Sequence, residues 1–263
     1  MDLKLSNNTV VIVGGASGIG KACAESFLAE GAIVSIWDSS PTVTEVANEL
    51  LCSGLQVDIA DESAVCDALH ITEQQQGPTQ HVVNAAAIGS GGLGMPFTSL
   101  KPGDWQRVID VNINGMVNVA HAFTAGMMER KDGTFVFIAS VAGQIGSPTD
   151  PPYSASKAAN INFAQVMAKD LAPHKVRVNT VCPGMVKTPL NQNVWRSWNE
   201  RQPEGKKLSY EAWAELKIRQ LVPLGTWQQP SDIANMVAFL SSDCACQITG
   251  QTINVDGGYV MHS

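Results

Sequence analysis

"TVVIVGGASGIGKACAESFLAEGA" (residues 9–32) decides the fold, because it holds a strand, a glycine-rich turn and a helix in direct succession. The run TVVIV (9–13) is apolar and β-branched without alternation, which is typical of a strand buried on both faces of a parallel sheet. KACAESFLAEGA (21–32) then places apolar residues at helical spacing and reaches Gly31, a residue type that often stops helices. The stretch predicts the first strand and first helix of an α/β domain.

Four glycines occupy the turn between this strand and this helix: Gly14, Gly15, Gly18 and Gly20. Glycine lets the backbone turn tightly and lets a pyrophosphate approach the N-terminus of the helix. The spacing G-x-x-x-G-x-G differs from the commonest dinucleotide fingerprint, G-x-G-x-x-G, and glycines also serve plain turns. Their place at the first strand-to-helix turn favours phosphate binding.

The rest of the chain repeats this alternation. Apolar runs predict further strands at 33–37, 55–57, 81–85, 133–140, 176–181 and 251–258. Helical patterns predict helices at 41–51, 62–75, 105–128, 151–165 and 230–242. The alternation indicates an α/β fold with a parallel sheet and helices on both faces. No linker divides residues 1–263, so we expect one domain.

Residues 185–229 form the one long irregular part of the chain. An irregular segment of that length inside a compact domain is usually functional. LSYEAWAELKIRQLV (208–222) predicts an amphipathic helix within it, so we expect a lid of two helices over the substrate. The tryptophans of this segment fit packing as well as substrate contact.

The composition argues against several classes of function. The 263 residues carry a net charge of −7, a pI near 5.2 and no basic run, which is unlike a nucleic-acid-binding surface. No apolar run reaches the roughly 18 residues of a membrane span, and MDLKLSNNTV lacks the apolar core of a signal peptide, so we expect a cytoplasmic protein. The six cysteines and five histidines lack metal-ligand spacings, which predicts reduced thiols and no metal.

Two acids follow strands on the side where a dinucleotide would lie. Asp38 stands 18 residues after Gly20, where an acid binds the hydroxyls of an adenosine ribose. An acid there repels a 2′-phosphate, and no Arg or Lys stands at 37–44, so the sequence favours NAD over NADP. Asp58, at the end of the third strand, is a second candidate on the cofactor side. Either acid could instead cap the following helix.

The stretch PPYSASKAANINFAQ (151–165) places Tyr153 and Lys157 four residues apart at the start of a predicted helix. Residues at that spacing share a helix face. The pair fits an ordinary amphipathic helix, and it also fits a phenol whose pKa is lowered by an ammonium. A free tyrosine has a pKa of about 10, so it needs such a shift to act as a base near neutral pH.

With its remaining motifs the sequence resembles the short-chain dehydrogenase/reductase family. The motifs are GGASGIG (14–20), Asp38, VDI (57–59), VNAAAI (83–88), VNING (111–115), IASVAG (138–143), YSASK (153–157), VRVNTVCPG (176–184) and ITGQTINVDGG (248–258). The resemblance covers essentially the whole chain and implies a single Rossmann-type, doubly wound domain with a seven-stranded parallel sheet. Val13 and Ala87 depart from the family pattern, which has Thr and Gly there.

The resemblance also implies roles by position. Tyr153 is expected to be the catalytic acid/base, and Lys157 to lower its pKa and hold the nicotinamide ribose. Ser140 is expected to bind the substrate oxygen and Asn112 to hold the water of a proton relay. Taken alone, Ser140 also fits a strand-end cap and Asn112 a kink or polar face of a helix. The other residues expected at the cofactor are Gly14, Ser17, Gly18, Ile19, Gly20, Asp38, Asp58, Ile59, Asn84, Pro183, Val186 and Thr188.

Substrate contacts are expected at Ser140 and Tyr153, with Gln144 and Asn191 as candidates for further hydroxyls or, equally, as solvated loop residues. The length of the lid segment is similar to that of family members that oxidise polyols, diols and sugars. We therefore expect reversible hydride transfer between NAD and a small polar secondary alcohol. An NAD(P)H-dependent carbonyl or 3-oxoacyl reductase is one alternative, and a catalytically silent dinucleotide-sensing protein is another.

Assembly is also expected from the resemblance, since the family is commonly tetrameric. The apolar segments SDIANMVAFLSS (231–242) and TINVD (252–256) suit packing against another subunit, which predicts a homotetramer. The tail GGYVMHS (257–263) is a candidate for reaching a neighbouring subunit's site.

Overall fold

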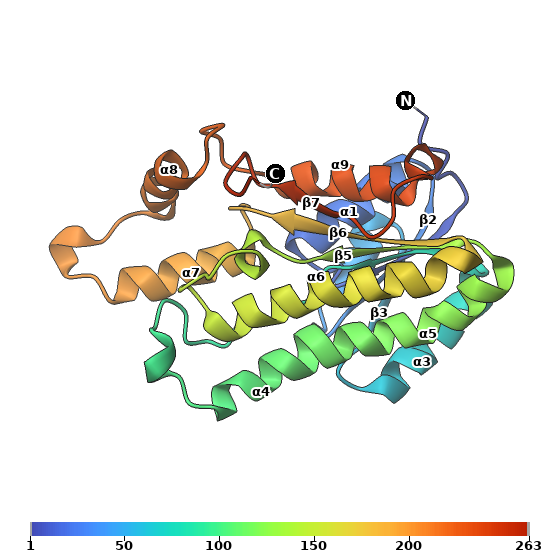
Figure 1. The fold of residues 1–263 in the computed structure, drawn as a ribbon, viewed down its shortest axis with the longest axis horizontal. Helices are drawn as coiled ribbons and strands as arrows, with labels where there is room; N and C mark the ends of the chain where they lie inside the picture. The colour runs from blue at the N-terminus through green and yellow to red at the C-terminus, as the bar shows by residue number, and fades with distance from the viewer. Residues whose placement is uncertain (1, 262–263) are drawn as a thin grey trace.

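Seven parallel strands form one sheet in the computed structural model, which describes residues 2–261 (Figure 1). The strands are β1 (Thr9–Val13), β2 (Ile33–Asp38), β3 (Ser53–Gln56), β4 (Thr79–Asn84), β5 (Gly133–Ile138), β6 (Val176–Pro183) and β7 (Thr252–Val255). Their order is β3-β2-β1-β4-β5-β6-β7, so the direction of winding reverses between β1 and β4. The carboxyl ends of strands at such a reversal form the usual ligand crevice of this type of sheet.

Helices cover both faces of the sheet, as the sequence predicts. One layer holds α1 (Gly18–Ala29), α2 (Val43–Leu50) and α9 (Pro230–Ser241), and the other holds α3 (Glu62–Gln76), α5 (Gly115–Arg130) and α6 (Pro151–Leu171).

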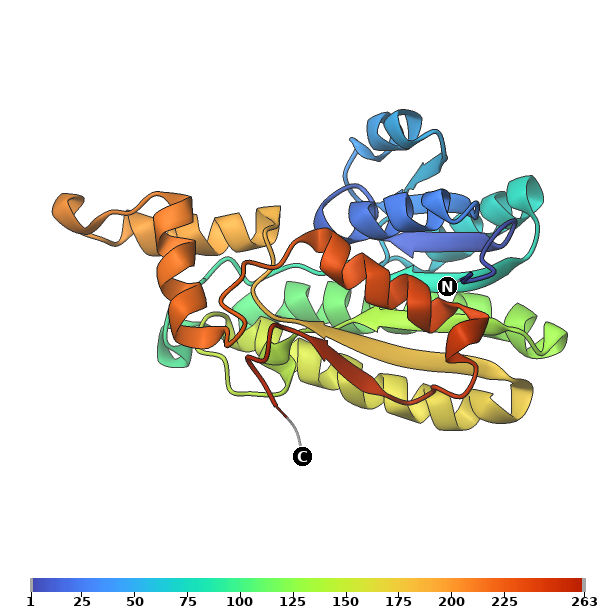
Figure 2. The same cartoon turned by 90° about the horizontal axis from the view of Figure 1, so that it is seen from above.

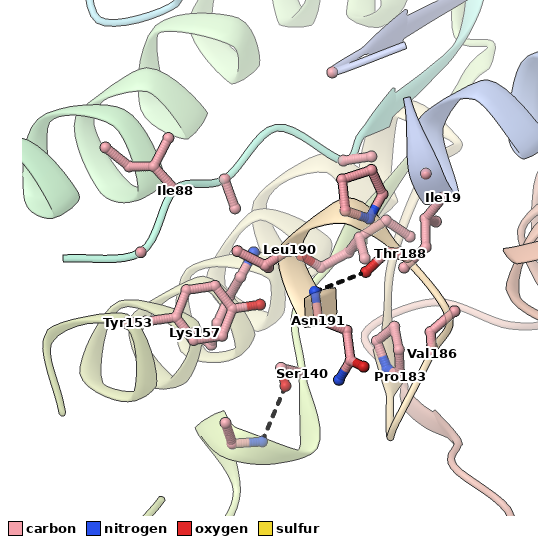
Figure 3. Close-up of a pocket in the computed structure, with 18 of the residues that line it drawn as sticks. Ile19, Ile88, Ser140, Tyr153, Lys157, Pro183, Val186, Thr188, Leu190 and Asn191 are labelled. Carbon is pink, nitrogen blue, oxygen red and sulfur yellow. Dashed lines mark hydrogen bonds between the residues drawn. The ribbon is translucent and has the colours of Figure 1, made fainter. Parts of the chain in front are cut away.

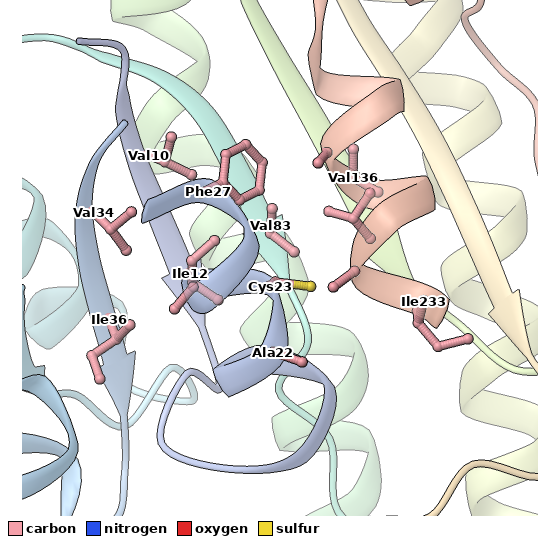
Figure 4. Close-up of a cluster of buried hydrophobic side chains, with 14 of the residues drawn as sticks. Val10, Ile12, Ala22, Cys23, Phe27, Val34, Ile36, Val83, Val136 and Ile233 are labelled. Atoms are coloured by element: carbon pink, nitrogen blue, oxygen red, sulfur yellow. The ribbon is translucent and has the colours of Figure 1, made fainter. Parts of the chain in front are cut away.

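The two cores follow from the alternation of side chains along each strand. Val10 and Ile12 of β1 pack with Phe27 of α1 in the first core, which Figure 4 shows between α1 and α9. Val11 of β1 packs with Phe123 of α5 in the second. All of these side chains are at most 3% exposed, so β1 is buried on both faces as its sequence indicates.

The helix predicted at 105–128 is not uniform. It consists of α4 (Gly103–Ile109), a π-helical turn (Asp110–Asn114) and α5. A π turn inserts one residue into the helix, and such turns occur often at functional sites. Asn112 lies in this turn.

The predicted lid helices are α7 (Pro189–Glu200) and α8 (Tyr210–Leu221), which extend beyond one end of the sheet (Figures 1 and 2). They have a small core of their own, in which the ring of Tyr210 contacts that of Trp227 edge-on at 4.8 Å between centroids. A bridge between Val186 and Gln228 joins the two ends of the segment. The tryptophans here therefore serve mainly as packing.

Short 3-10 turns complete the described chain at Phe97–Ser99, Val141–Gly143, Ala172–His174, Glu204–Lys206 and Asp243–Ala245. The strand predicted at 55–57 begins two residues earlier than expected and ends at Gln56, although the N–H of Val57 still donates to the carbonyl of Asp38 at 2.9 Å. Within residues 2–261, no helix has the length and apolar character needed to cross a membrane.

Candidate active site

A cavity of about 530 Å³ lies at the carboxyl ends of the central strands. The glycine turn before α1 lines one end of it, and residues of α7 and α8 line the other. Figure 3 shows the middle of this cavity, where Tyr153 and Lys157 of α6 lie near Ser140 and the start of the lid. The volume is within the range of about 300–1,000 Å³ that small-molecule sites occupy.

The glycine turn is packed too closely for side chains. Gly14 has a φ of +79°, and a Cβ there would lie 2.6 Å from the backbone nitrogen of Ala86, just after β4. A Cβ at Gly20 would overlap the carbonyl oxygen of Gly14. Ser17 at the N-cap of α1 makes no side-chain hydrogen bond to the first turn, which also has no acidic residue. The backbone N–H groups in the first turn of α1 therefore have no side-chain partner and could bind a pyrophosphate, so the turn fits a dinucleotide cofactor.

Asp38 holds the glycine turn against the end of β2. Its Oδ2 accepts a hydrogen bond from the N–H of Ala16 at 3.1 Å, and its Oδ1 accepts one from the N–H of Ser40 at 2.9 Å. The residue lines the cavity. It does not cap a helix, since the N-cap of α2 is Thr42.

Asp58 and Ile59 also line the cofactor end of the cavity. Oδ1 of Asp58 accepts from the N–H of Ala60 at 3.0 Å. The cap of α3 is Asp61, whose side chain accepts from the N–H groups of Ser63 and Ala64. The helix-cap interpretation therefore does not apply to Asp58.

Lys157 is only 2% exposed, and its Nζ donates a hydrogen bond to the carbonyl of Ile138, at the end of β5, at 2.7 Å. The same atom lies 5.5 Å from the centre of the Tyr153 ring. Burial lowers the pKa of Lys157 to about 8, because the charged form loses its hydration.

Tyr153 faces the cavity, yet burial of its hydroxyl raises its pKa well above the ordinary value. The Ser140 hydroxyl lowers this pKa, whereas the charges of Asp150 and Cys182 raise it. Burial of the phenol is the largest influence on this pKa, and the expectation that Lys157, together with a charged cofactor ring, lowers it stays a prediction. Ser140 is the group of the chain that favours the phenolate.

Asn112 uses both polar atoms of its side chain inside the protein. Its Oδ1 accepts from the N–H of Ile88 at 2.9 Å, and its Nδ2 donates to the carbonyl of Ile88 at 3.0 Å and to Oγ of Ser156 at 3.0 Å. Its backbone carbonyl accepts from Nδ2 of Asn160 at 2.7 Å. Asn112 does not line the cavity and instead fixes Ile88, which does. The relay-water role stays a prediction.

The other predicted residues divide into two groups. Those that line the cavity are Gly14, Ser17, Gly18, Ile19, Gly20, Asp38, Asp58, Ile59, Ser140, Tyr153, Lys157, Pro183, Val186, Thr188 and Asn191. Asn84 and Gln144 do not line it. Asn84 Oδ1 accepts from the N–H of Ala86 at 3.2 Å, and Gln144 Nε2 donates to Oδ1 of Asn254 at 2.7 Å. The structure therefore does not bring Gln144 to the cavity in which the substrate was expected to contact it.

The start of the lid is fixed by two of the predicted residues. Oγ1 of Thr188 accepts from the N–H of Asn191 at 3.2 Å and caps α7 (Figure 3). Oδ1 of Asn191 accepts from the hydroxyl of Tyr210 at 2.9 Å, which joins α7 to α8. Thr188, which is expected to contact the cofactor, is therefore also the residue that caps the first lid helix.

Four further lining residues had no individual role in the sequence-based predictions: Asp150, Trp213, Lys217 and Tyr259. Trp213 and Lys217 are four residues apart on α8, so the helical spacing of that segment could have identified them as one face. Tyr259 belongs to the tail that was expected to reach a neighbouring subunit, and it lines the cavity of its own chain. The contact with a neighbouring subunit stays a prediction. His262 and Ser263 lie outside the described residues.

Known proteins resemble this chain along nearly its whole length. The family profile described as Enoyl-(Acyl carrier protein) reductase matches residues 14–260. 2-(S)-hydroxypropyl-CoM dehydrogenase 3 of Xanthobacter autotrophicus is 35% identical, with 98% of each chain covered. A 3-oxoacyl-(acyl-carrier-protein) reductase of Synechocystis sp. is 33% identical, also with 98% of each chain covered. The solved structure of levodione reductase matches with a TM-score of 0.89 at 27% identity, covering 97% of this chain and 98% of that one.

These matches include the glycine turn, the π turn of Asn112 and the segment of Tyr153 and Lys157. They agree with the seven-stranded parallel sheet and with the cavity at its carboxyl edge. The chain belongs to the short-chain dehydrogenase/reductase family and is an oxidoreductase that works with a nicotinamide dinucleotide.

Proposed function

We propose that this enzyme transfers a hydride between NAD and a small polar secondary alcohol or its ketone. The observation that carries the proposal is one cavity lined by the glycine turn, by Asp38 and by the catalytic candidates Ser140, Tyr153 and Lys157. A cofactor held at the glycine turn would extend along the cavity toward Tyr153, where the substrate would lie.

The donors of this site suit proton transfer to and from an alcohol. Oγ of Ser140 accepts from the N–H of Ala142 at 3.1 Å, which leaves its hydroxyl hydrogen to be donated either to the oxygen of Tyr153 or, when substrate is bound, to the substrate oxygen. The phenolic oxygen of Tyr153 takes the carbinol proton during oxidation and returns it during reduction. The ammonium of Lys157 has three N–H donors, of which one binds the carbonyl of Ile138 and two remain for the cofactor ribose. When bound, NAD supplies the hydride acceptor and a positively charged ring.

Asp38 supports NAD over NADP. Its carboxylate lines the cavity at the ribose end and would repel a 2′-phosphate. Lys21 is the basic residue of α1, and its Nζ pairs with Glu49 of α2 at 2.9 Å, so its charge is already matched.

The small polar substrate is supported by the walls of the cavity and by one relative. Asp150, Asn191 and Lys217 place polar groups in the cavity wall among apolar lid residues. The relative at 35% identity is named as a dehydrogenase of a 2-hydroxypropyl group, which is a secondary alcohol. Polar groups at fixed points in an apolar pocket are what orient a small hydroxylated ligand.

A panel of substrates and cofactors tests this proposal. Polyols, diols and hydroxy acids, assayed at high pH with NAD and with NADP, are expected to give turnover with NAD and a kcat/KM at least about tenfold lower with NADP. Alkaline pH favours oxidation because burial raises the pKa of Tyr153 and the base form is required. Activity confined to NADPH and 3-oxoacyl thioesters would contradict the proposal.

Variants of the two acids at the cofactor end serve as a matched control for that panel. Asp38→Asn removes the charge and keeps one oxygen for the glycine turn, so the NADP to NAD ratio of kcat/KM is expected to rise about tenfold or more. Asp58→Asn removes a charge from the same end of the cavity and is expected to change the ratio much less. Equal effects of the two variants would remove Asp38 as the selecting residue.

A 3-oxoacyl reductase is the second candidate function. The family profile and the relative from Synechocystis favour it, because both are named for reductases of carrier-bound acyl groups. The same Ser140, Tyr153 and Lys157 would serve that reaction, so the panel of substrates separates the two functions.

We further propose a homotetramer, supported by the open edge of the sheet. β7 is the last strand of the sheet and has only β6 beside it, and its four residues are partly exposed. An unpaired edge of this kind is normally covered. Light scattering is expected to give a mass about four times the 28.0 kDa of the chain, and a monomer mass would contradict this assembly.

A further inference from the structure

Asp150 is a buried carboxylate in the wall of the cavity. The residue is 4% exposed, lines the cavity and lies three residues before Tyr153. It occupies the N-cap position of α6, yet its side chain makes no hydrogen bond to the first turn of that helix. The side chain of Asp150 therefore has a role other than capping this helix.

Hydrogen bonds from the protein occupy only part of the acceptor capacity of the Asp150 carboxylate. Oδ2 accepts from the backbone N–H of Ser90 at 2.8 Å, and Oδ1 accepts from the hydroxyl of the same residue at 2.8 Å. An ionised carboxylate offers about four acceptor positions, so about two stay free. The ion pairs among residues 2–261 join Lys21 to Glu49, Lys207 to Glu204 and Arg219 to Glu215, and none includes Asp150.

A buried charge without a counter-ion is costly, so its retention calls for a physical reason. The N-terminus of α6 offsets part of the cost through its dipole. Gly89 leaves room for the carboxylate, since a Cβ at that residue would lie 2.8 Å from Oδ2. The chain at 89–90 is thus arranged around Asp150 and binds it from one side.

The other side of Asp150 is close to the reacting position. Asp150 and Tyr153 line the same cavity, and after burial, the main cause, the charge of Asp150 also contributes to the raised pKa of Tyr153. Tyr153 follows three residues later, in the first turn of α6. The carboxylate of Asp150 and the phenol of Tyr153 therefore belong to one stretch of the cavity wall, where a bound substrate can supply a hydrogen-bond donor.

We propose that Asp150 accepts a hydrogen bond from a second hydroxyl of the substrate, next to the carbinol from which Tyr153 takes its proton. The preferred substrate is then a vicinal diol, or the corresponding hydroxy ketone in the reverse direction. This assignment rests on the proposed function, and it names the group by which the enzyme distinguishes a diol from a simple alcohol.

The test compares butane-2,3-diol, in its separate stereoisomers, with butan-2-ol and NAD as cofactor. The wild-type enzyme is expected to favour the better diol isomer over butan-2-ol by tenfold or more in kcat/KM, since hydrogen bonds to charged groups contribute about that factor or more. Asp150→Asn is expected to lower this ratio by about tenfold, mainly by raising KM for the diol.

Asp170→Asn is the matched control, because it makes the same chemical change at an exposed position near the other end of α6, outside the cavity lining. It is expected to affect both substrates alike, so the ratio stays within about twofold. A wild-type enzyme that oxidises both compounds equally well overturns this inference and leaves the proposed function standing, even if Asp150→Asn does not fold. An unchanged ratio in a folded Asp150→Asn enzyme also overturns it. A wild type that oxidises no alcohol with NAD overturns both.

Discussion

The Tyr153→Phe enzyme is expected to bind NAD with an affinity within about threefold of the wild type and to oxidise alcohols at least about a hundredfold to ten-thousandfold more slowly. The substitution removes only the phenolic oxygen, which is the atom proposed to accept the carbinol proton, and general acid–base catalysis typically contributes a factor of that size. The aromatic ring, which lies 5.5 Å from Nζ of Lys157, is retained. Steady-state kinetics and calorimetric titration with NAD measure the two quantities.

Tyr259→Phe is the control for this experiment. Tyr259 also lines the cavity, but it belongs to the C-terminal segment and packs with Val141 and Cys182. Its loss is expected to change kcat by less than about tenfold. The comparison also tests the alternative of a dinucleotide-sensing protein, whose output would not depend on the phenolic oxygen. A Tyr153→Phe enzyme with full turnover would remove the proposed acid/base.

Replacing Lys157 with Met is expected to lower kcat/KM by about a hundredfold or more and to weaken NAD binding about tenfold. The variant keeps the volume of a side chain that is 2% exposed and removes the donors proposed for the cofactor ribose. Preorganised donors in a buried site contribute factors of this size. Stopped-flow or steady-state kinetics, together with NAD titration, measure the effect, and an active Lys157→Met enzyme would contradict the assigned role.

The same variant tests the energetics of the buried ammonium in protein prepared without cofactor. Burial lowers the pKa of Lys157 from 10.5 to about 8 in the folded protein. Between these two pH values the unfolded chain binds more protons than the folded chain, so the free energy of unfolding rises with pH through this group. Below pH 8 the full cost of burying the charge is present.

Wild type is therefore expected to gain about 2 kcal/mol in free energy of unfolding relative to Lys157→Met between about pH 7.5 and 9.5, at up to about 1.4 kcal/mol per pH unit. The raised pKa of Tyr153 acts in the opposite direction, but only above the ordinary tyrosine pKa of about 10. Urea denaturation of both proteins at the two pH values measures the difference. A constant difference would mean that Lys157 is not buried as described.

The fold could be predicted from the sequence because its signals are local. The run 9–13 is apolar at every position, which requires burial on both faces, and the glycines after it leave few alternatives for the turn. For a given order of strands, the right-handed crossovers between parallel strands determine which face each helix covers. What the periodicity did not reveal is the π turn at Asp110–Asn114, because one inserted residue hardly changes the spacing of apolar positions.

The site could be predicted as far as it depends on motifs, and less well where it depends on contacts between distant segments. Gln144 was expected at the substrate, but its partner Asn254 is 110 positions away and holds it outside the cavity. The contact between Asp150 and Ser90 could not be predicted, because 60 positions separate the two residues. The direction of Lys157 toward the carbonyl of Ile138 likewise depends on how α6 packs against β5.

We expect a hydride to pass directly between the carbinol carbon of an alcohol and NAD at the site of Tyr153. The most direct measurement uses an alcohol with deuterium on that carbon, for example butane-2,3-diol labelled at C2 and C3, followed by mass spectrometry of the reduced cofactor. Reduced cofactor is expected to carry one deuterium per turnover in the wild type, and no such product is expected with Tyr153→Phe on the same timescale. Reduced cofactor without deuterium, or equal label with both enzymes, would contradict it.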